Sequence, residues 1–110
     1  MLKMSVSLAK IDRLIHKIDF KPFNVVVDMF KANDNDYRIK VRLFHINYQM
    51  GIIEFVKANL MILDGCVYGR FYTSEKNRPV ITWHSIDYVN ERKFVRDLEQ
   101  TLKSCVDHLS

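Results

Sequence analysis

The dipeptide Asp64-Gly65 constrains the fold of this 110-residue chain more than any other feature. Asp-Gly between two apolar runs is typical of the two-residue type I′ turn, whose twist matches that of a β-hairpin. Such a turn fixes the register of the strands on either side, and the predicted opposite pairs are Leu63–Cys66, Ile62–Val67, Met61–Tyr68, Leu60–Gly69, Asn59–Arg70 and Lys57–Tyr72. Because side chains alternate between the two faces of a strand, we expect one hairpin face to be amphipathic and solvated and the other to lie in the core (Ala58, Leu60, Ile62, Val67 and Phe71).

Further strands are predicted on both sides of this hairpin. Residues 23–30 form an apolar run, and residues 37–47 alternate between apolar side chains and Arg38, Lys40 and Arg42. The apolar segment 52–63 fits either one long bent strand or two short ones, and residues 80–84 fit a last strand. The polar stretches 32–36, 47–51 and 74–79 are expected to be turns or connections.

Two amphipathic helices are predicted near the ends of the chain. The first has apolar residues at helical spacing from Leu8 to Ile18, a cap at Ser5 or Ser7, and an end imposed by Pro22. The second is capped by Asn90, has a hydrophobic staple of Val89 and Phe94, and presents one apolar face (Phe94, Val95, Leu98, Leu102, Cys105, Val106 and Leu109). Strands that follow one another between two helices favour a single α+β domain over residues 1–110. We expect an antiparallel twisted sheet of about five strands flanked by an N-terminal helix and a long C-terminal helix.

The chain is basic, with 17 Lys and Arg against 13 Asp and Glu and a formal net charge of +4. The excess lies in residues 37–84, which hold seven Lys and Arg against three carboxylates, whereas residues 85–110 hold four against five. A positive surface favours anionic partners. No apolar run has the length of a signal peptide or a membrane span, so we expect a cytoplasmic protein without membrane attachment. The bias toward Phe, Tyr, Ile, Asn and Lys suggests AT-rich codons, as in low-GC bacteria and their phages or plasmids.

The sequence carries no motif of a known catalytic, metal or cofactor site. Cys66 and Cys105 form no CxxC and are expected to be reduced core residues, with one disulfide as the alternative. The four histidines (His16, His45, His84 and His108) show no ligand spacing, although sheet contacts would allow His45 and His84 to meet. With three glycines in the chain, we find no phosphate-binding loop or dinucleotide fingerprint. We therefore predict a non-catalytic protein with no cofactor and no metal.

The sharpest functional feature is a basic, tyrosine-bearing sheet face. Arg38, Lys40 and Arg42 repeat every second residue, so they line one face at roughly 7 Å intervals, close to the spacing of phosphates along a single strand. The hairpin adds two cations and two aromatic rings (Lys57, Arg70, Tyr68 and Tyr72). Cations that hold phosphates and tyrosines that stack bases are typical of single-stranded nucleic-acid binding. The sequence leaves open whether the basic strand and the hairpin present these residues on the same side.

Two other interpretations of this surface stand beside the first. A basic alternating strand is also the ordinary solvated face of an antiparallel sheet. The alternative function is a protein-binding regulator, such as an inhibitor, antitoxin, immunity protein or chaperone. Its expected anchors are exposed aromatic residues (Tyr37, Tyr48, Tyr72, Trp83 and Tyr88). A homodimer is also expected, because a small sheet has edges to cover.

Overall fold

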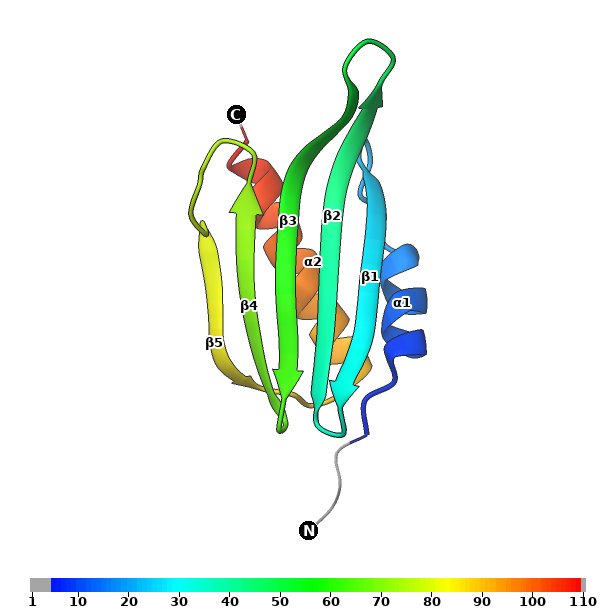
Figure 1. The fold of residues 1–110 in the computed structure, drawn as a ribbon, viewed down its shortest axis with the longest axis vertical. Helices are drawn as coiled ribbons and strands as arrows, with labels where there is room; N and C mark the ends of the chain where they lie inside the picture. The colour runs from blue at the N-terminus through cyan, green and yellow to red at the C-terminus, as the bar shows by residue number, and fades with distance from the viewer. Residues whose placement is uncertain (1–4, 110) are drawn as a thin grey trace.

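Two helices flank an antiparallel five-stranded sheet, and the strands follow one another in space as they do along the chain (Figure 1). The computed structural model describes residues 5–109. Its elements are α1 (Leu8–His16), β1 (Asn24–Asn33), β2 (Asp36–Asn47), β3 (Gly51–Leu63), β4 (Cys66–Thr73), β5 (Ile81–Asp87) and α2 (Glu91–Asp107). The predicted α+β class, with its sheet between an N-terminal and a C-terminal helix, is confirmed.

The hairpin at Asp64-Gly65 has the predicted register at every pair from Leu63–Cys66 to Lys57–Tyr72. Asp64 and Gly65 have φ angles of 49° and 80°, as a type I′ turn requires at both central positions. The segment 52–63 lies within one strand, β3, and its register with β2 shifts between Leu43 and Phe44, so that Phe55 of β3 is the extra residue of a β-bulge.

Three predicted boundaries are wrong by a few residues. The turn expected at 32–36 is shorter, because Asn33 pairs with Asp36 and the strands continue to that pair. The last strand runs on from His84 to Asp87, because β5 pairs with β4 as far as Cys66–Asp87. The first helix ends at His16, earlier than its apolar spacing predicts, although Ile18 and Phe20 still pack on the core.

The core lies between the sheet and helix α2, which passes behind the strands in Figure 1. Both sides supply fully buried apolar side chains: Val41, Leu43, Val56, Ala58 and Phe71 from the sheet, and Leu98, Leu102 and Cys105 from α2. Helix α1 contributes Ile11 and Ile15 beside β1. The helices therefore cover one face of the sheet. Neither helix of residues 5–109 is long and apolar enough to span a bilayer.

The caps of both helices involve the predicted polar side chains, but the staple differs. Ser7 Oγ accepts a hydrogen bond from Lys10 N at 3.2 Å, and Asn90 Oδ1 accepts one from Lys93 N at 2.8 Å. Val89 is 61% exposed, so the Val89–Phe94 staple is not formed in the way predicted. Tyr88 is the residue that packs on Phe94, with ring centroids 6.1 Å apart.

The two cysteines are both free thiols, and only one of them belongs to the core. Cys105 is fully buried, and burial raises the pKa of its thiol to about 11. Cys66 is partly exposed, which corrects its assignment as a core residue. The reason is its register: Cys66 is two residues from Tyr68 and shares the face of β4 that points away from the helices.

Removing one side chain from the helix–sheet interface should destabilise the whole fold. Leu98 is fully buried in this interface, so Leu98→Ala should lower the free energy of unfolding by about 2–5 kcal/mol. The measurement is urea denaturation followed by circular dichroism. Arg96→Ala, on the exposed side of the same helix, is the matched control and should change stability by less than about 0.5 kcal/mol. Equal effects of the two substitutions would contradict this placement of α2.

Candidate functional site

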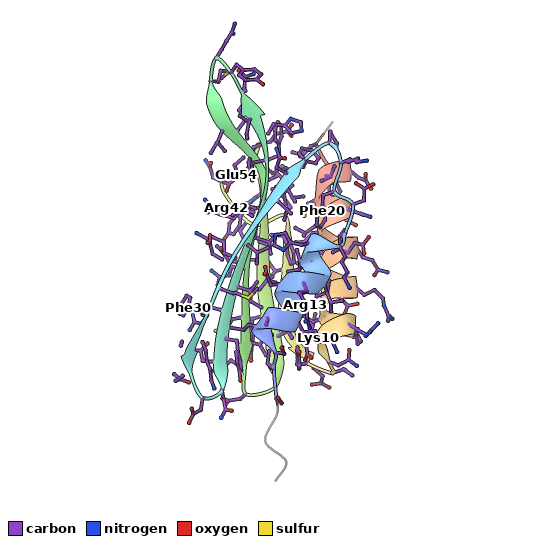
Figure 2. The ribbon with its side chains drawn as sticks, turned by 90° about the vertical axis from the view of Figure 1, so that its right-hand side faces the viewer. Lys10, Arg13, Phe20, Phe30, Arg42 and Glu54 are labelled. Atoms are coloured by element: carbon purple, nitrogen blue, oxygen red, sulfur yellow. The ribbon has the colours of Figure 1, made fainter. Side chains whose placement is uncertain are left out.

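The basic strand and the hairpin present their side chains on the same face of the sheet. In the β2–β3 and β3–β4 registers, Arg38 lies opposite Met61, which lies opposite Tyr68. Residues directly opposite each other in a sheet point to the same side. All the predicted site residues (Arg38, Lys40, Arg42, Lys57, Tyr68, Arg70 and Tyr72) therefore lie on the face that the helices do not cover, which we call the open face. Figure 2 shows Phe30 and Arg42 pointing away from the helices on this side.

One cross-strand row of the open face lies toward the β2–β3 turn and contains Arg42, Lys57 and Tyr72. Arg42 is already paired, because its Nη2 donates to Asp28 Oδ2 at 3.0 Å. Lys57 Nζ lies 5.0 Å from the centroid of the Tyr72 ring, in cation–π contact. Both cations of this row thus have an internal partner.

The middle row crosses all five strands and contains Asp28, Lys40, Asn59, Arg70 and Thr82. Lys40 and Arg70 are exposed and flank Asn59 on either side. Within residues 5–109, neither of these two cations lies within 4 Å of a carboxylate. With strands about 4.8 Å apart, their backbones are separated by about 10 Å, and an anion placed over Asn59 can be reached from both sides.

The third row contains two aromatic residues of the open face, Phe30 and Tyr68. Phe30 is 61% exposed at one end, and Arg38, Met61 and Tyr68 follow across β2, β3 and β4. The Tyr68 ring meets the ring of His84 edge-on, with centroids 5.8 Å apart. This row therefore offers a ring on the edge strand β1, a ring on β4, and the Met61 thioether on β3 between them.

Arg38 is occupied by a bidentate ion pair with Asp36. Its Nε and Nη2 donate to the two carboxylate oxygens at 2.7 and 3.0 Å. This hydrogen bonding lowers the pKa of the buried Asp36 below its ordinary value, and it raises the pKa of Arg38. Arg38 carries its charge on the open face, but Asp36 neutralises most of its field.

A hollow of about 730 Å³ lies over the middle and aromatic rows. Its polar and charged lining comes from Asp28, Arg38, Lys40, Asn59, Arg70, Thr82 and His84, and its apolar lining includes Phe30, Met61, Tyr68 and Trp83. The volume is in the range of small-ligand pockets, which are about 300–1,000 Å³. The hollow thus combines two cations that have no carboxylate partner within residues 5–109, Lys40 and Arg70, with the rings of Phe30 and Tyr68.

Sequence reasoning missed several residues that complete this site. Phe30, Met61, Thr82 and His84 line the hollow but were not predicted as binding residues. The alternation of residues 23–30 was enough to predict that Phe30 lies on the open face. Val27 and Met29 face the core, and Phe30 points to the other face of the same strand. Nothing local indicated that His84 would reach the ring of Tyr68, because β4 and β5 are joined by an irregular connection and a shifted register.

The aromatic anchors expected for a protein-binding surface separate into buried and exposed groups. Tyr37 and Tyr88 are 8% and 5% exposed and belong to the core, so they are not surface anchors. Trp83 is partly buried between Phe71 and Phe94, with ring centroids at 4.9 and 6.4 Å. Tyr48 is fully exposed at the β2–β3 turn.

The histidines do not converge on a common site. His45 stacks on Phe23 at 4.8 Å between centroids, whereas His84 contacts Tyr68. Among residues 5–109, no group of three or more His, Cys, Asp and Glu side chains is arranged to hold a metal ion.

The Asp36–Arg38 pair should make stability depend on pH in the acidic range. The folded-state pKa of Asp36 lies below its unfolded value, so the pair stabilises the fold above the unfolded pKa. This contribution is lost as the pH falls through the folded pKa. Carbon-13 NMR should show Asp36 titrating below an ordinary aspartate, and Arg38→Ala should move its midpoint upward. An unchanged midpoint in Arg38→Ala would show that the ion pair does not control this carboxyl group.

Comparisons with known proteins leave this site to be interpreted from its own geometry. No protein-family model, curated protein or solved structure matches the chain. The open face is characterised by its three rows, its hollow, and two cations that have no carboxylate partner within residues 5–109.

Proposed function

We propose that the open face holds single-stranded DNA or RNA, and that the protein acts by occupancy rather than by turnover. The observation that carries this proposal is the middle row, where Lys40 and Arg70 have no acidic partner within residues 5–109 and flank Asn59 beside the rings of Phe30 and Tyr68. Phosphates are bound by the two cations, and exposed bases stack on the rings. A duplex is excluded from this mode, because its bases are stacked inside and cannot reach an aromatic side chain.

The ion pairs make this interface weaker than the cation content of the face suggests. Arg38 and Arg42 are engaged with Asp36 and Asp28, and Lys57 lies on Tyr72. Stacking contributes about 1–3 kcal/mol per base. We therefore expect the rings and the two cations to contribute comparably to the binding free energy. The expected mode is a short, sequence-tolerant contact with one or two bases rather than an extended phosphate track.

The salt dependence of binding should report the number of free cations. Two phosphate contacts predict a slope of about −1.4 in log K against log salt, or about a sevenfold loss of affinity between 50 and 200 mM. Fluorescence anisotropy with labelled DNA and RNA oligonucleotides measures this slope. Lys40→Ala/Arg70→Ala should weaken binding strongly and remove most of its salt dependence, whereas Arg13→Ala/Arg96→Ala, which removes the same charge from the two helices, should reduce it only slightly. Absence of binding to both oligonucleotides at low salt would contradict the proposal and favour a protein partner.

Releasing a paired arginine should strengthen the same interface. Asp28→Asn removes the carboxylate that holds Arg42, and its side chain is 63% exposed, so the fold should be unaffected. We expect higher oligonucleotide affinity and a salt slope that steepens from about −1.4 to about −2.1, because one more cation contacts phosphate. Asp12→Asn on helix α1 makes the same charge change away from the open face and is the control. A gain of the same size in Asp12→Asn would indicate a general charge effect.

A further inference from the structure

The β2–β3 hairpin extends beyond the rest of the sheet. Strand β1 pairs with β2 no further than Asn24–Phe44, and β4 pairs with β3 no further than Thr73–Val56. Strands β2 and β3 continue to pair with each other up to Asn47–Gly51. Residues 45–53 therefore form a two-stranded ribbon, which we call the arm, and it projects from the sheet in Figure 1. The molecule is correspondingly elongated, with extents of 53 × 25 × 22 Å.

The arm is formed by specific local contacts. Asn47 Oδ1 accepts hydrogen bonds from Gln49 N at 2.8 Å and Met50 N at 3.0 Å, and Gly51 has a φ of 79° that closes the turn. At its base, His45 stacks on Phe23 and meets Phe55, with ring centroids 4.8 and 5.0 Å apart. These contacts shape the turn and pack the base of the ribbon on Phe23 and Phe55.

The surface of the arm is apolar. Ile46 and Ile52 lie directly opposite each other and are 65% and 72% exposed, and Tyr48 and Met50 at the turn are 105% and 75% exposed. The other large apolar side chains exposed among the described residues (Phe30, Ile86 and Val89) are scattered over different elements. Apolar exposure at this density in one segment marks an interaction surface.

The arm also lacks the features by which strands avoid association. Residues 45–53 contain no Lys, Arg, Asp, Glu or Pro in a chain of which 27% is charged. Among the strands of residues 5–109, none pairs with the outer edge of either strand of the ribbon. Natural proteins usually protect such edges with charge or proline, and an isolated two-stranded ribbon is only marginally stable in water. These features indicate that the apolar surface of the arm is an interface that a partner covers.

We propose that the arm is a homodimer interface, in which the arms of two copies pack about a two-fold axis and bury Ile46, Tyr48, Met50 and Ile52. A nucleic acid or a charged protein finds no complementary charge on the arm, whereas a second arm matches its neutrality and its apolar character. Four side chains of this size expose roughly 500 Å² per copy, so complete burial of both sets removes about 1,000 Å² from water, which is the minimum expected of a specific interface. A two-fold contact of identical patches also closes on itself, without further polymerisation. This inference is independent of the proposed nucleic-acid binding, because the arm contains none of the residues that line the hollow.

Analytical ultracentrifugation over a range of concentrations tests the proposal. The wild-type chain should shift from its monomer mass of 13.1 kDa toward twice that value as its concentration rises. Ile46→Lys/Ile52→Lys should remain monomeric at the same concentrations, because it introduces like charges into an apolar contact. Both side chains are exposed, so circular dichroism and the melting temperature should show that the monomer keeps its fold.

The matched control is Val89→Lys, which places a charge on an exposed apolar residue outside the arm and should leave the dimer intact. High salt should not weaken the dimer, in contrast to oligonucleotide binding, so the two proposals fail independently. A wild-type chain that stays monomeric at every concentration would overturn the proposal. A dimer that survives Ile46→Lys/Ile52→Lys, or that Val89→Lys disrupts, would do the same.

Discussion

The packing of helix α2 against one face of the sheet is the interaction on which the rest of the structure depends. Five strands present two faces, and the apolar residues of α1 and α2 suffice to bury only one of them. The covered face therefore carries the aliphatic and aromatic side chains, whereas the other face must be compatible with water. The polar and charged residues at alternate positions of β2, β3 and β4 follow from this one-sided cover. The open face exists because the helices cover only the other face of the sheet. Its polar and charged side chains are therefore free to contact a partner.

Charge on the open face is decided by pairing as much as by composition. Asp28 and Asp36 neutralise the two arginines of β2, so the positive field concentrates on Lys40 and Arg70. These two residues lie on either side of the central strand, where the hollow brings them together with aromatic rings. The positive charge of the strand is therefore concentrated at one place on the open face. For this reason we expect the proposed contact with nucleic acid to be short and its salt dependence to be modest.

Strands β2 and β3 form both the arm and the centre of the open face. Below the bulge at Leu43 and Phe44, β2 and β3 lie between neighbours and contribute charged side chains to the open face. In the arm (residues 45–53) no other strand of residues 5–109 pairs with them, and this segment contains no Lys, Arg, Asp or Glu. A charged surface suits solvated anionic ligands, and an uncharged ribbon suits a like partner. The two proposed interactions can therefore be formed at the same time by separate parts of the molecule.

The sequence by itself determined the features that depend on near neighbours. The Asp64-Gly65 turn set the hairpin register, alternation along residues 37–43 assigned each side chain to a face, and the apolar spacing of residues 94–109 defined α2, because turn geometry and side-chain periodicity are local properties. Tertiary structure alone decided which distant residues meet. It placed the basic strand and the tyrosine hairpin on one side, joined Asp28 to Arg42 across 14 residues, and buried Tyr88. It also left the arm unpaired, since that depends on where β1 and β4 end. Each of these outcomes is set by the pairing and packing of separate strands, which no local pattern encodes.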